Sequence, residues 1–147
     1  MRQFGCTHRI LALCSFLVLV LLAGNLWAQP VKRVVVLETM DAPIVSQFTG
    51  AFLKRLSQLG GQSSTEFEIV QLGADGSRSR AESLLSRALE QDADIVVTVA
   101  TMASQVAKEM LAGKNIPLVF MCVTDPVGAG LISRVGEPGG ENITGKI

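Results

Sequence analysis

Residues Val123–Leu131, VTDPVGAGL, directly follow the apolar run Ile116–Cys122, IPLVFMC. Such a short run bounded by turn-forming residues is typical of a strand buried in a parallel sheet. The pair Asp125-Pro126 then predicts a helix start, because aspartate caps a helix and proline fits its first turn. The same residues would follow the carboxyl end of a strand, where open parallel sheets bind ligands. The stretch therefore predicts a strand-to-helix turn, the rim of a ligand site, or both.

Upstream of this stretch, short apolar runs alternate with segments of helical periodicity. We expect strands at 31–37, 67–72, 95–100 and 118–123, with helices that begin near Asp41, Ser77 and Met102. The apolar face of the first helix is predicted to consist of Ile44, Phe48, Phe52, Leu56 and Leu59. The alternation predicts an α/β fold, with a parallel sheet and helices on both of its faces. The tail from Gly136 is rich in glycine and polar residues and is predicted to be a linker or a frayed end.

The first 28 residues have the order of parts of a secretory signal peptide. Arg2 and Arg9 form a basic start, Ile10–Ala23 is an uncharged apolar run, and Leu26-Trp27-Ala28 offers a small residue for cleavage. An uncleaved membrane anchor is the alternative, but the run is short for a membrane span. We therefore expect a periplasmic chain of residues 29–147 that does not span the membrane.

Charge and composition exclude several classes of function for this mature chain. Cleavage leaves 11 basic residues against 13 acidic ones, a net charge of −2 with no basic patch, so no nucleic-acid partner is expected. The only histidine, His8, is lost with the signal, and Cys122 is the only remaining cysteine. A histidine-based triad, a Cys/His metal site and an internal disulfide are therefore all ruled out. The sequence also lacks the glycine loops that bind nucleotides and the nucleophile elbow of hydrolases. We therefore expect neither an enzyme nor a cofactor. A carboxylate-based hydrolase stays open as an alternative.

Candidate binding residues lie in the loops that follow the predicted strands, at 38–41, 73–77, 101–104 and 124–126. Three of these loops lead into helix N-termini, whose free N–H groups favour carboxylates or phosphates. Thr101 and Ser104 would add hydroxyls there, and the Asp125 carboxylate would hold an ammonium group. For each residue, helix capping alone is the alternative role.

Residues Ile116–Gly145 resemble the substrate-binding proteins of ABC importers, in the branch that includes tryptophan- and tyrosine-binding proteins. The segments Val-Thr-Asp-Pro-Val and Ala-Gly-Leu of that branch are intact, and its Pro-Gly-Gly-Asn-Ile-Thr-Gly segment carries Glu141 as an insertion. Upstream, DADIVVTVATMASQVA (residues 92–107) is similar to the strand and Thr-Pro-Ala-Ala turn of the family, with Met102 in place of the proline.

The resemblance implies a type I periplasmic-binding-protein fold, in which two Rossmann-like α/β lobes joined by a hinge clamp a small organic solute, here an amino acid. It implies an ABC permease of the inner membrane as the partner. The chain departs from the family in the first loop, with Ala42-Pro43 where a His-Pro pair is frequent, which leaves the identity of the solute open. The residues that the matching motifs place in the cleft are Thr39, Asp41, Thr101, Ser104, Thr124 and Asp125.

Family members continue beyond the segment that ends at Gly145 into the second lobe, whereas this chain stops at Ile147. The resemblance therefore predicts a chain truncated to an incomplete N-terminal lobe that ends at the hinge crossover. Two alternatives to an importer component stay open: the ectodomain lobe of a sensor or receptor with the same fold, and a non-functional fragment. A LacI-type regulator would need a helix-turn-helix in place of the signal peptide.

Overall fold

The computed structural model describes residues 31–63, 66–137, 139 and 142–146. The expected signal peptide, residues 1–28, lies outside this part of the chain. Within it, no helix combines the length and the apolar character that a membrane span requires. The strands are β1 (Val31–Glu38), β2 (Glu66–Gly73), β3 (Ile95–Val99), β4 (Leu118–Met121) and β5 (Ile143–Lys146), and the helices are α2 (Pro43–Ser63), α3 (Arg78–Leu89) and α4 (Thr101–Met110).

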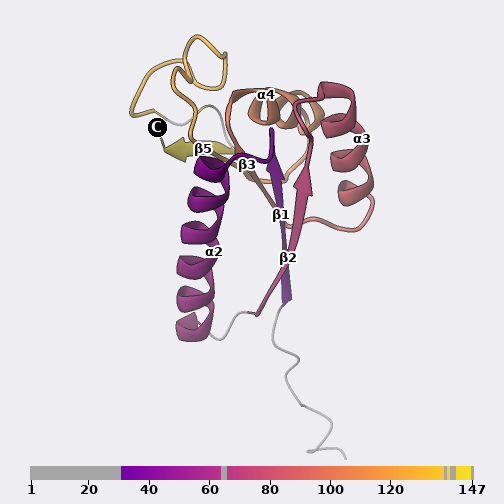
Figure 1. Ribbon diagram of the computed structural model, residues 1–147, viewed down its shortest axis with the longest axis vertical. Coiled ribbons are helices and arrows are strands. Elements are labelled where there is room, and N and C mark those ends of the chain that lie inside the picture. The colour runs from indigo at the N-terminus through magenta and orange to yellow at the C-terminus, as the bar shows by residue number, and fades with distance from the viewer. Residues whose placement is uncertain (1–30, 64–65, 138, 140–141, 147) are drawn as a thin grey trace, which may run out of the picture.

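All described strands form one parallel sheet in the order β2-β1-β3-β4-β5 (Figure 1). β1 and β3 lie in its centre, which explains why the buried part of each is almost entirely apolar, with Thr98 of β3 as the exception. Val34–Leu37 of β1 are buried without a break, and so are Val96–Val99 of β3. The predicted α/β fold with a parallel sheet and helices on both faces is thus confirmed.

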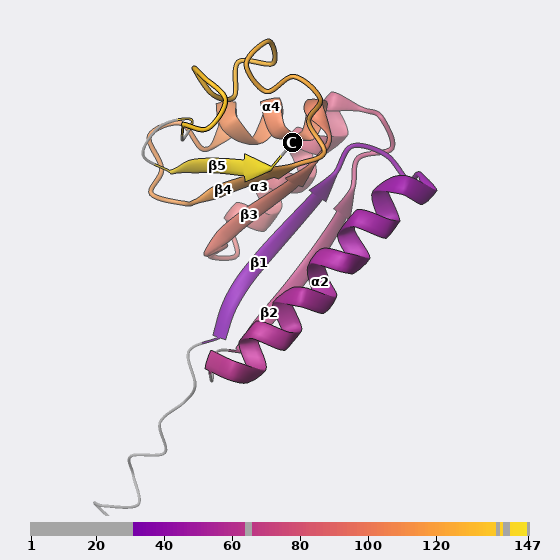
Figure 2. The same ribbon diagram turned by 90° about the vertical axis from the view of Figure 1, so that its left-hand side faces the viewer.

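The two faces of the sheet carry different helices. α2 lies on one face, against β1 and β2, while α3 and α4 lie on the other (Figures 1 and 2). With α2 towards the viewer, β2 lies to the right of β1, so the connection is right-handed (Figure 2). The chain moves one way along the sheet from β1 to β2, and the other way from β2 to β3 and from β3 to β4. Right-handed connections in that second direction place α3 and α4 on the opposite face from α2.

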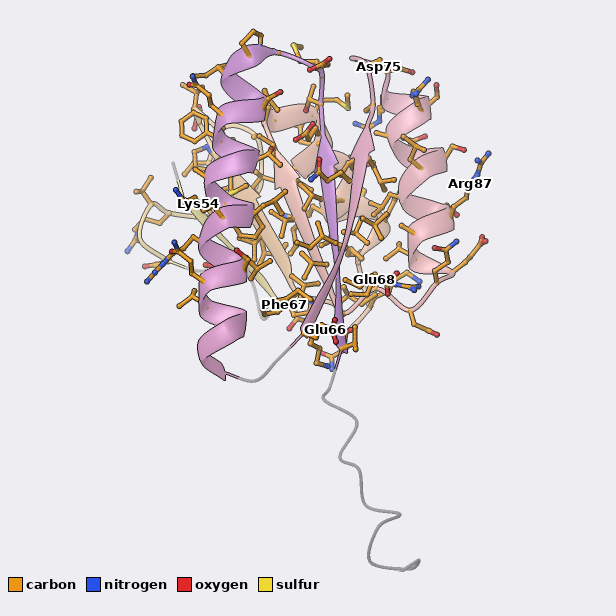
Figure 3. The ribbon with its side chains drawn as sticks, turned by 60° about the horizontal axis from the view of Figure 1, so that its bottom comes forward. Lys54, Glu66, Phe67, Glu68, Asp75 and Arg87 are labelled. Atoms are coloured by element: carbon orange, nitrogen blue, oxygen red, sulfur yellow. The ribbon has the colours of Figure 1, made fainter. Side chains whose placement is uncertain are left out.

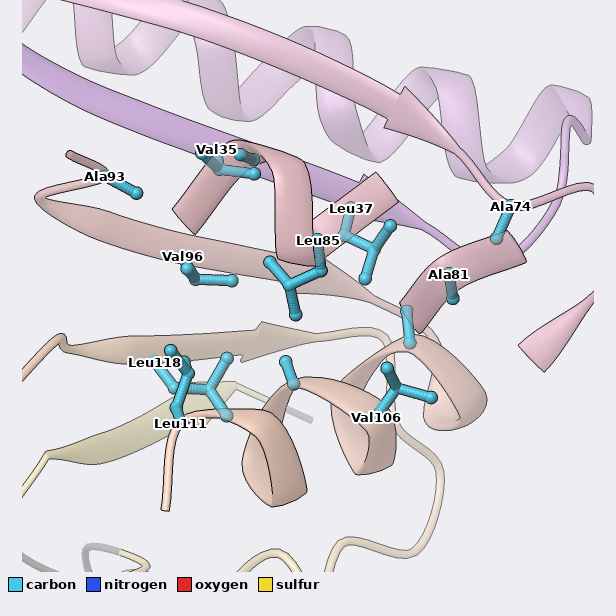
Figure 4. Packing of buried hydrophobic residues seen from close by; sticks show 13 residues of the cluster. Val35, Leu37, Ala74, Ala81, Leu85, Ala93, Val96, Val106, Leu111 and Leu118 are labelled. Atoms are coloured by element: carbon cyan, nitrogen blue, oxygen red, sulfur yellow. The ribbon is translucent and has the colours of Figure 1, made fainter. Parts of the chain in front are cut away.

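The larger core cluster lies between the sheet and helices α3 and α4 (Figure 4). Leu37 of β1, Leu85 of α3, Val106 of α4 and Leu118 of β4 meet there, and each is almost completely buried. Fully burying a side chain of this size stabilises the fold by about 1.5–3 kcal/mol. The core therefore fixes α4 firmly against the central strands, and with it the loop that precedes α4.

The predicted apolar face of α2 is only partly right. Phe52 and Leu56 pack against the sheet as expected, together with Val45 and Leu53. In contrast, Ile44, Phe48 and Leu59 are exposed, with 59%, 50% and 43% of their surfaces accessible. These three residues lie along one flank of the helix, next to its buried side.

The structure also corrects the prediction for the residues after β4. No helix forms after Asp125-Pro126; residues 126–130 form a turn in which the Ala129 amide donates to the Asp125 carbonyl oxygen (2.9 Å). Gly130 has a φ of 71°, a left-handed conformation that ends a helical turn.

The tail is not a frayed end, because its residues Ile143–Lys146 form β5 and pair with β4. Gly145 makes this pairing possible: a Cβ atom there would lie 2.4 Å from the ring of Phe120. A short strand that contains glycine carries little β-propensity, so the sequence did not predict it.

Ion pairs gather at the amino end of the sheet. Figure 3 shows Glu66, Phe67 and Glu68 at this end of β2, and Asp75 beyond the opposite end. Arg33 donates to both carboxylate oxygens of Glu68, at 2.9–3.0 Å, and the Lys32 ammonium lies 2.7 Å from the Asp94 carboxylate. The predicted binding residues all lie at the other end, at the carboxyl edge of the strands.

Candidate functional site at the carboxyl edge of the sheet

The carboxyl edge is organised around Thr39, the first residue after β1. β1 connects to β2 on one side and β3 lies on the other, so Thr39 stands at the topological switch point of the sheet. Its hydroxyl donates to the Val99 carbonyl oxygen at 3.1 Å and accepts from the Ala103 amide at 3.1 Å. Only 7% of Thr39 is accessible. Its hydroxyl is therefore used inside the fold, where it joins the end of β1 to the first turn of α4.

The turn from β3 into α4 has an unusual backbone. Ala100, the N-cap of α4, has φ 73° and ψ 171°, a region that is essentially restricted to glycine and costs a side-chain-bearing residue roughly 1–3 kcal/mol. Its side chain offers no oxygen to cap the helix, and the first turn of α4 contains no acidic residue. The amides of Thr101 and Met102 come first in α4 and have no acceptor within the helix. This N-terminus therefore presents N–H donors and the positive end of the helix dipole at the edge.

The two predicted hydroxyl residues of α4 take different places. Thr101 is exposed at the edge. Ser104 is completely buried; its hydroxyl lies 2.9 Å from that of Thr98 and donates to the Ala100 carbonyl oxygen at 2.8 Å. Ser104 therefore holds the Ala100 turn in place from beneath, and does not present its hydroxyl at the edge.

The loop after β4 lies beside this helix start. The Ala100 amide donates to the Met121 carbonyl oxygen at 3.0 Å, which keeps the ends of β3 and β4 together. Thr124 and Asp125 follow and are both exposed. One Asp125 carboxylate oxygen accepts from the Gly128 amide at 2.8 Å, so this carboxylate closes a turn and does not cap the helix that the sequence predicted. Cys122 follows the last residue of β4 and has a φ of 56°. Burial raises the pKa of its thiol.

The first loop places Asp41 on the surface, two residues before α2 begins. The sequence did not single out Glu38, the last residue of β1, as a residue of the site. Its half-buried carboxylate accepts a hydrogen bond from the hydroxyl of Thr49 on α2. A glutamate directly after a buried apolar run was the available signal. Its partner Thr49, six residues after the start of α2, could be identified only from the structure.

These residues form a polar edge and not a closed pocket. Thr101, Thr124 and the α4 amides are donors suited to a carboxylate, and Asp125 and Asp41 are suited to an ammonium group. No group of three or more metal-ligating side chains occurs among the described residues. A hollow of about 450 Å³ lies elsewhere, between the end of α4 and the start of β5, and is lined by residues such as Leu111, Ile116 and Asn142.

Comparison with known proteins identifies the family. The family described as ABC transporter substrate binding protein matches residues 33–146. The Tyrosine-binding protein of Clostridioides difficile (strain R20291) is 27% identical over 114 residues, which cover 78% of this chain and 32% of that protein. The chain thus spans about a third of the length of this curated relative.

Solved structures agree with the fold. A conserved domain protein from Vibrio cholerae is 30% identical with a TM-score of 0.67, and the match covers 78% of this chain and 38% of that one. An ABC domain from Streptococcus pneumoniae, solved in complex with L-Trp, has a TM-score of 0.65 at 23% identity, over 78% and 37% of the two chains. A ligand-free, open substrate-binding protein with adhesive properties from Clostridium difficile has a TM-score of 0.67 at 25% identity. This match covers 78% of this chain and 38% of that one.

The family match extends from β1 to β5 and contains every residue of the carboxyl edge described above. Proteins of this family bind substrates and do not convert them, which agrees with the prediction that the chain is not an enzyme. The chain belongs to the family of ABC transporter substrate-binding proteins.

Proposed function

We propose that this chain forms one wall of a cleft that binds a free amino acid, as the extracytoplasmic solute-binding component of an ABC importer. The observation that carries the proposal is the start of α4, held by Thr39 at the switch point of the sheet with the amides of Thr101 and Met102 at the edge. A relative named for tyrosine binding and a structural neighbour solved with L-Trp support an aromatic amino acid as the ligand.

The ligand's carboxylate would bind at the start of α4. The Thr101 and Met102 amides and the Thr101 hydroxyl would donate to its oxygens, in the place that a capping side chain leaves open at Ala100. Thr39 and Ser104 are positioning residues in this scheme, because their hydroxyls hold the turn and not the ligand.

The ligand's ammonium group would face carboxylates on either side of this helix start. Asp125 lies in the loop after β4 and retains one carboxylate oxygen that is not bonded to Gly128. Asp41 lies in the loop after β1, and Thr124 adds a hydroxyl beside Asp125. Donors for the carboxylate beside carboxylates for the ammonium group would select an amino-acid zwitterion over a simple acid or amine.

Residues 29–147 are proposed to act outside the cytoplasm after removal of residues 1–28, and to deliver the solute to a permease of the inner membrane. The second wall of the cleft would come from the other lobe of a full-length substrate-binding protein, since the match covers about a third of the curated relative. Because ligand pockets bury most of the ligand surface, a single open wall would bind weakly.

The test is a titration of the ¹⁵N-labelled chain with L-tryptophan, observed by NMR. The proposal predicts that the amide signals of Thr101 and Met102 shift, together with those of Thr124 and Asp125. Tryptamine, which lacks the carboxylate, should leave the Thr101 and Met102 signals in place. Shifts confined to residues outside the edge, or equal shifts with both compounds, would overturn the proposal.

A further inference from the structure

The outer edge of β2 has no partner strand among the described residues. β2 lies at one end of the sheet, with β1 on its other side. Figures 1 and 3 look onto this edge, with β2 in front and α2 and α3 on either side of it. A free strand edge offers unpaired N–H and C=O groups to any strand that can lie alongside it.

Alternate residues of β2 direct their backbone groups out of the sheet. The Ala74 amide donates to the Glu38 carbonyl oxygen of β1, so the residues of even number in β2 face β1. The Arg80 guanidinium confirms the opposite direction for Gly73, because its Nε donates to the Gly73 carbonyl oxygen at 3.1 Å. The residues whose backbone groups point outward are therefore those of odd number: Phe67, Ile69, Gln71 and Gly73.

This edge lacks the usual features that keep free edges apart. β2 is eight residues long, contains neither lysine nor proline, and pairs with β1 in an unbroken register without a bulge. β5, at the opposite end of the sheet, has only four residues. The β2 edge is therefore the longer of the two free edges and the better template for strand pairing.

A second copy of β2 fits this edge in the antiparallel direction. A two-fold axis perpendicular to the sheet keeps every side chain on its own face, so residues of the same parity must lie opposite each other. With the axis at Val70, Phe67 lies opposite Gly73 of the second copy, and both carry outward backbone groups. Ile69 lies opposite Gln71 in the same way. All outward groups are then paired, and a large ring lies beside a glycine, which is a favourable cross-strand pair.

α2 leaves room for its own copy. Because α2 covers β1 and β2, the α2 helix of the second copy would lie two strand spacings away, about 10 Å, which is a normal distance between packed helices. The right-handed turn of the helix places Ser46, Gly50 and Ser57 on the flank that borders the β2 edge. No contact within the chain requires glycine at position 50, since a Cβ atom there would meet nothing within 4 Å. A neighbouring helix would explain it.

The charges at the two ends of this edge are complementary. Arg80 lies at the carboxyl end of β2, on the flank of α3 that is turned away from α4, because Arg78 on the other flank pairs with Glu109 of α4. Glu66 is exposed at the amino end of β2, on the same strand face as Leu72, which packs in the α3 and α4 cluster. The antiparallel pairing therefore brings Glu66 of each copy beside Arg80 of the other.

The other charges near these ends balance one another. Asp75 lies 3.2 Å from the Arg80 guanidinium in the same chain. Arg87 lies seven residues after Arg80, on the same flank of α3 and nearer to the amino end of β2. Each end of the pair would thus contain Glu66 and Arg87 of one copy and Asp75 and Arg80 of the other, two acidic and two basic groups.

We propose that the outer edge of β2 is a homodimer interface, in which two copies of this chain pair β2 with β2 antiparallel about Val70 and join their sheets. A second copy suits this edge better than an unrelated strand, because its own Glu66 and Arg80 supply both partner charges. The contact is symmetric and closes after two copies. It uses no residue of the carboxyl edge, so this inference does not depend on the ligand.

The first test is sedimentation velocity of the full chain over a range of micromolar concentrations, where the wild type should form a dimer that dissociates on dilution. Gln71→Pro removes an outward amide at an exposed edge position that tolerates proline, and should weaken dimerisation at least about tenfold. Gln71→Ala keeps the amide and is the matched control, which should dimerise like the wild type. A monomeric wild type, or a dimer that survives Gln71→Pro, would overturn the proposal.

The second test exchanges charges between the copies. Glu66→Arg and Arg80→Glu each bring like charges together at both ends, so each variant alone should dimerise about tenfold more weakly. An equimolar mixture of the two variants should regain the wild-type affinity, because opposite charges then meet at both ends. This rescue does not arise from a fault in folding. A mixture no tighter than the single variants would contradict the antiparallel pairing, and species larger than dimers would favour contact between β2 and β5 instead.

Discussion

The hydroxyl of Thr39 accepts a hydrogen bond from the amide of Ala103 at 3.1 Å, across the switch point between β1 and β3. The same hydroxyl donates to the Val99 carbonyl oxygen, so one buried side chain joins the ends of two central strands to the start of α4. In this way the candidate site is placed by the core of the fold. The amides that would meet a ligand carboxylate are fixed without using the side chains that face solvent.

Replacing Thr39 by valine should therefore destabilise the protein while keeping its shape. Valine fills the same volume but leaves the buried Ala103 amide without an acceptor, which costs about 1–3 kcal/mol. The measurement is urea unfolding of the wild type and of Thr39→Val. Thr39→Ser keeps the hydroxyl and is the matched control, with an expected loss below about 1.5 kcal/mol. Equal losses in the two variants would show that the hydroxyl contributes nothing.

Gly145 tests whether β5 is a true part of the sheet. Gly145→Ala would place a Cβ atom 2.4 Å from the Phe120 ring and the Phe120 carbonyl oxygen, so β5 should detach or shift. We expect faster hydrogen exchange at the Leu118 amide, which donates to Asn142, and a loss of about 1–3 kcal/mol in unfolding free energy.

The control for that variant is Gly50→Ala on α2, where the added Cβ meets no atom within 4 Å. Alanine is favoured over glycine inside a helix, so this variant should gain about 0.5–1 kcal/mol. Unchanged exchange at Leu118 in Gly145→Ala would contradict the pairing of β5 with β4.

The fold was predictable where burial alone shapes the sequence. Val34–Leu37 lie in a strand covered on both faces, so each position must be apolar and the run is visible without alignment. Helical periodicity was less informative for α2, because it groups Ile44 and Phe48 with Phe52. Only the structure shows that Ile44 and Phe48 lie beside the packed side, where described residues do not cover them.

For the site, the sequence predicted which residues follow the strands but not how their side chains are used. Thr101 and Ser104 are equivalent hydroxyl residues in the sequence. Their difference arises from Thr98, which lies beneath the turn and bonds to Ser104. Likewise Thr39 is bonded to Ala103, 64 positions later, a contact that no local pattern contains.

The ion pair at the amino end of the sheet should make stability depend on acid pH. Hydrogen bonds from the Lys32 ammonium and then from the Arg33 amide hold the pKa of Asp94 below its usual 3.8. Since the folded pKa is the lower one, the contribution is complete above the unfolded pKa near 3.8 and is lost as the pH falls through the folded pKa. In urea unfolding between about pH 2 and pH 6, Asp94→Asn should flatten the acid slope of stability. An unchanged slope would contradict this assignment.

Asp125 offers the sharpest test of the proposed ammonium site, because its two possible roles separate in one variant. The asparagine side chain of Asp125→Asn still presents an oxygen to the Gly128 amide, so this variant should keep the turn and change the unfolding free energy by less than about 0.5 kcal/mol. It would lose the charge that faces a ligand ammonium group, so affinity for L-tryptophan should fall about tenfold, as expected when a charge-assisted hydrogen bond is lost. Calorimetry measures both quantities on the same protein. Unchanged affinity in this variant would leave Asp125 as a turn residue and remove it from the site.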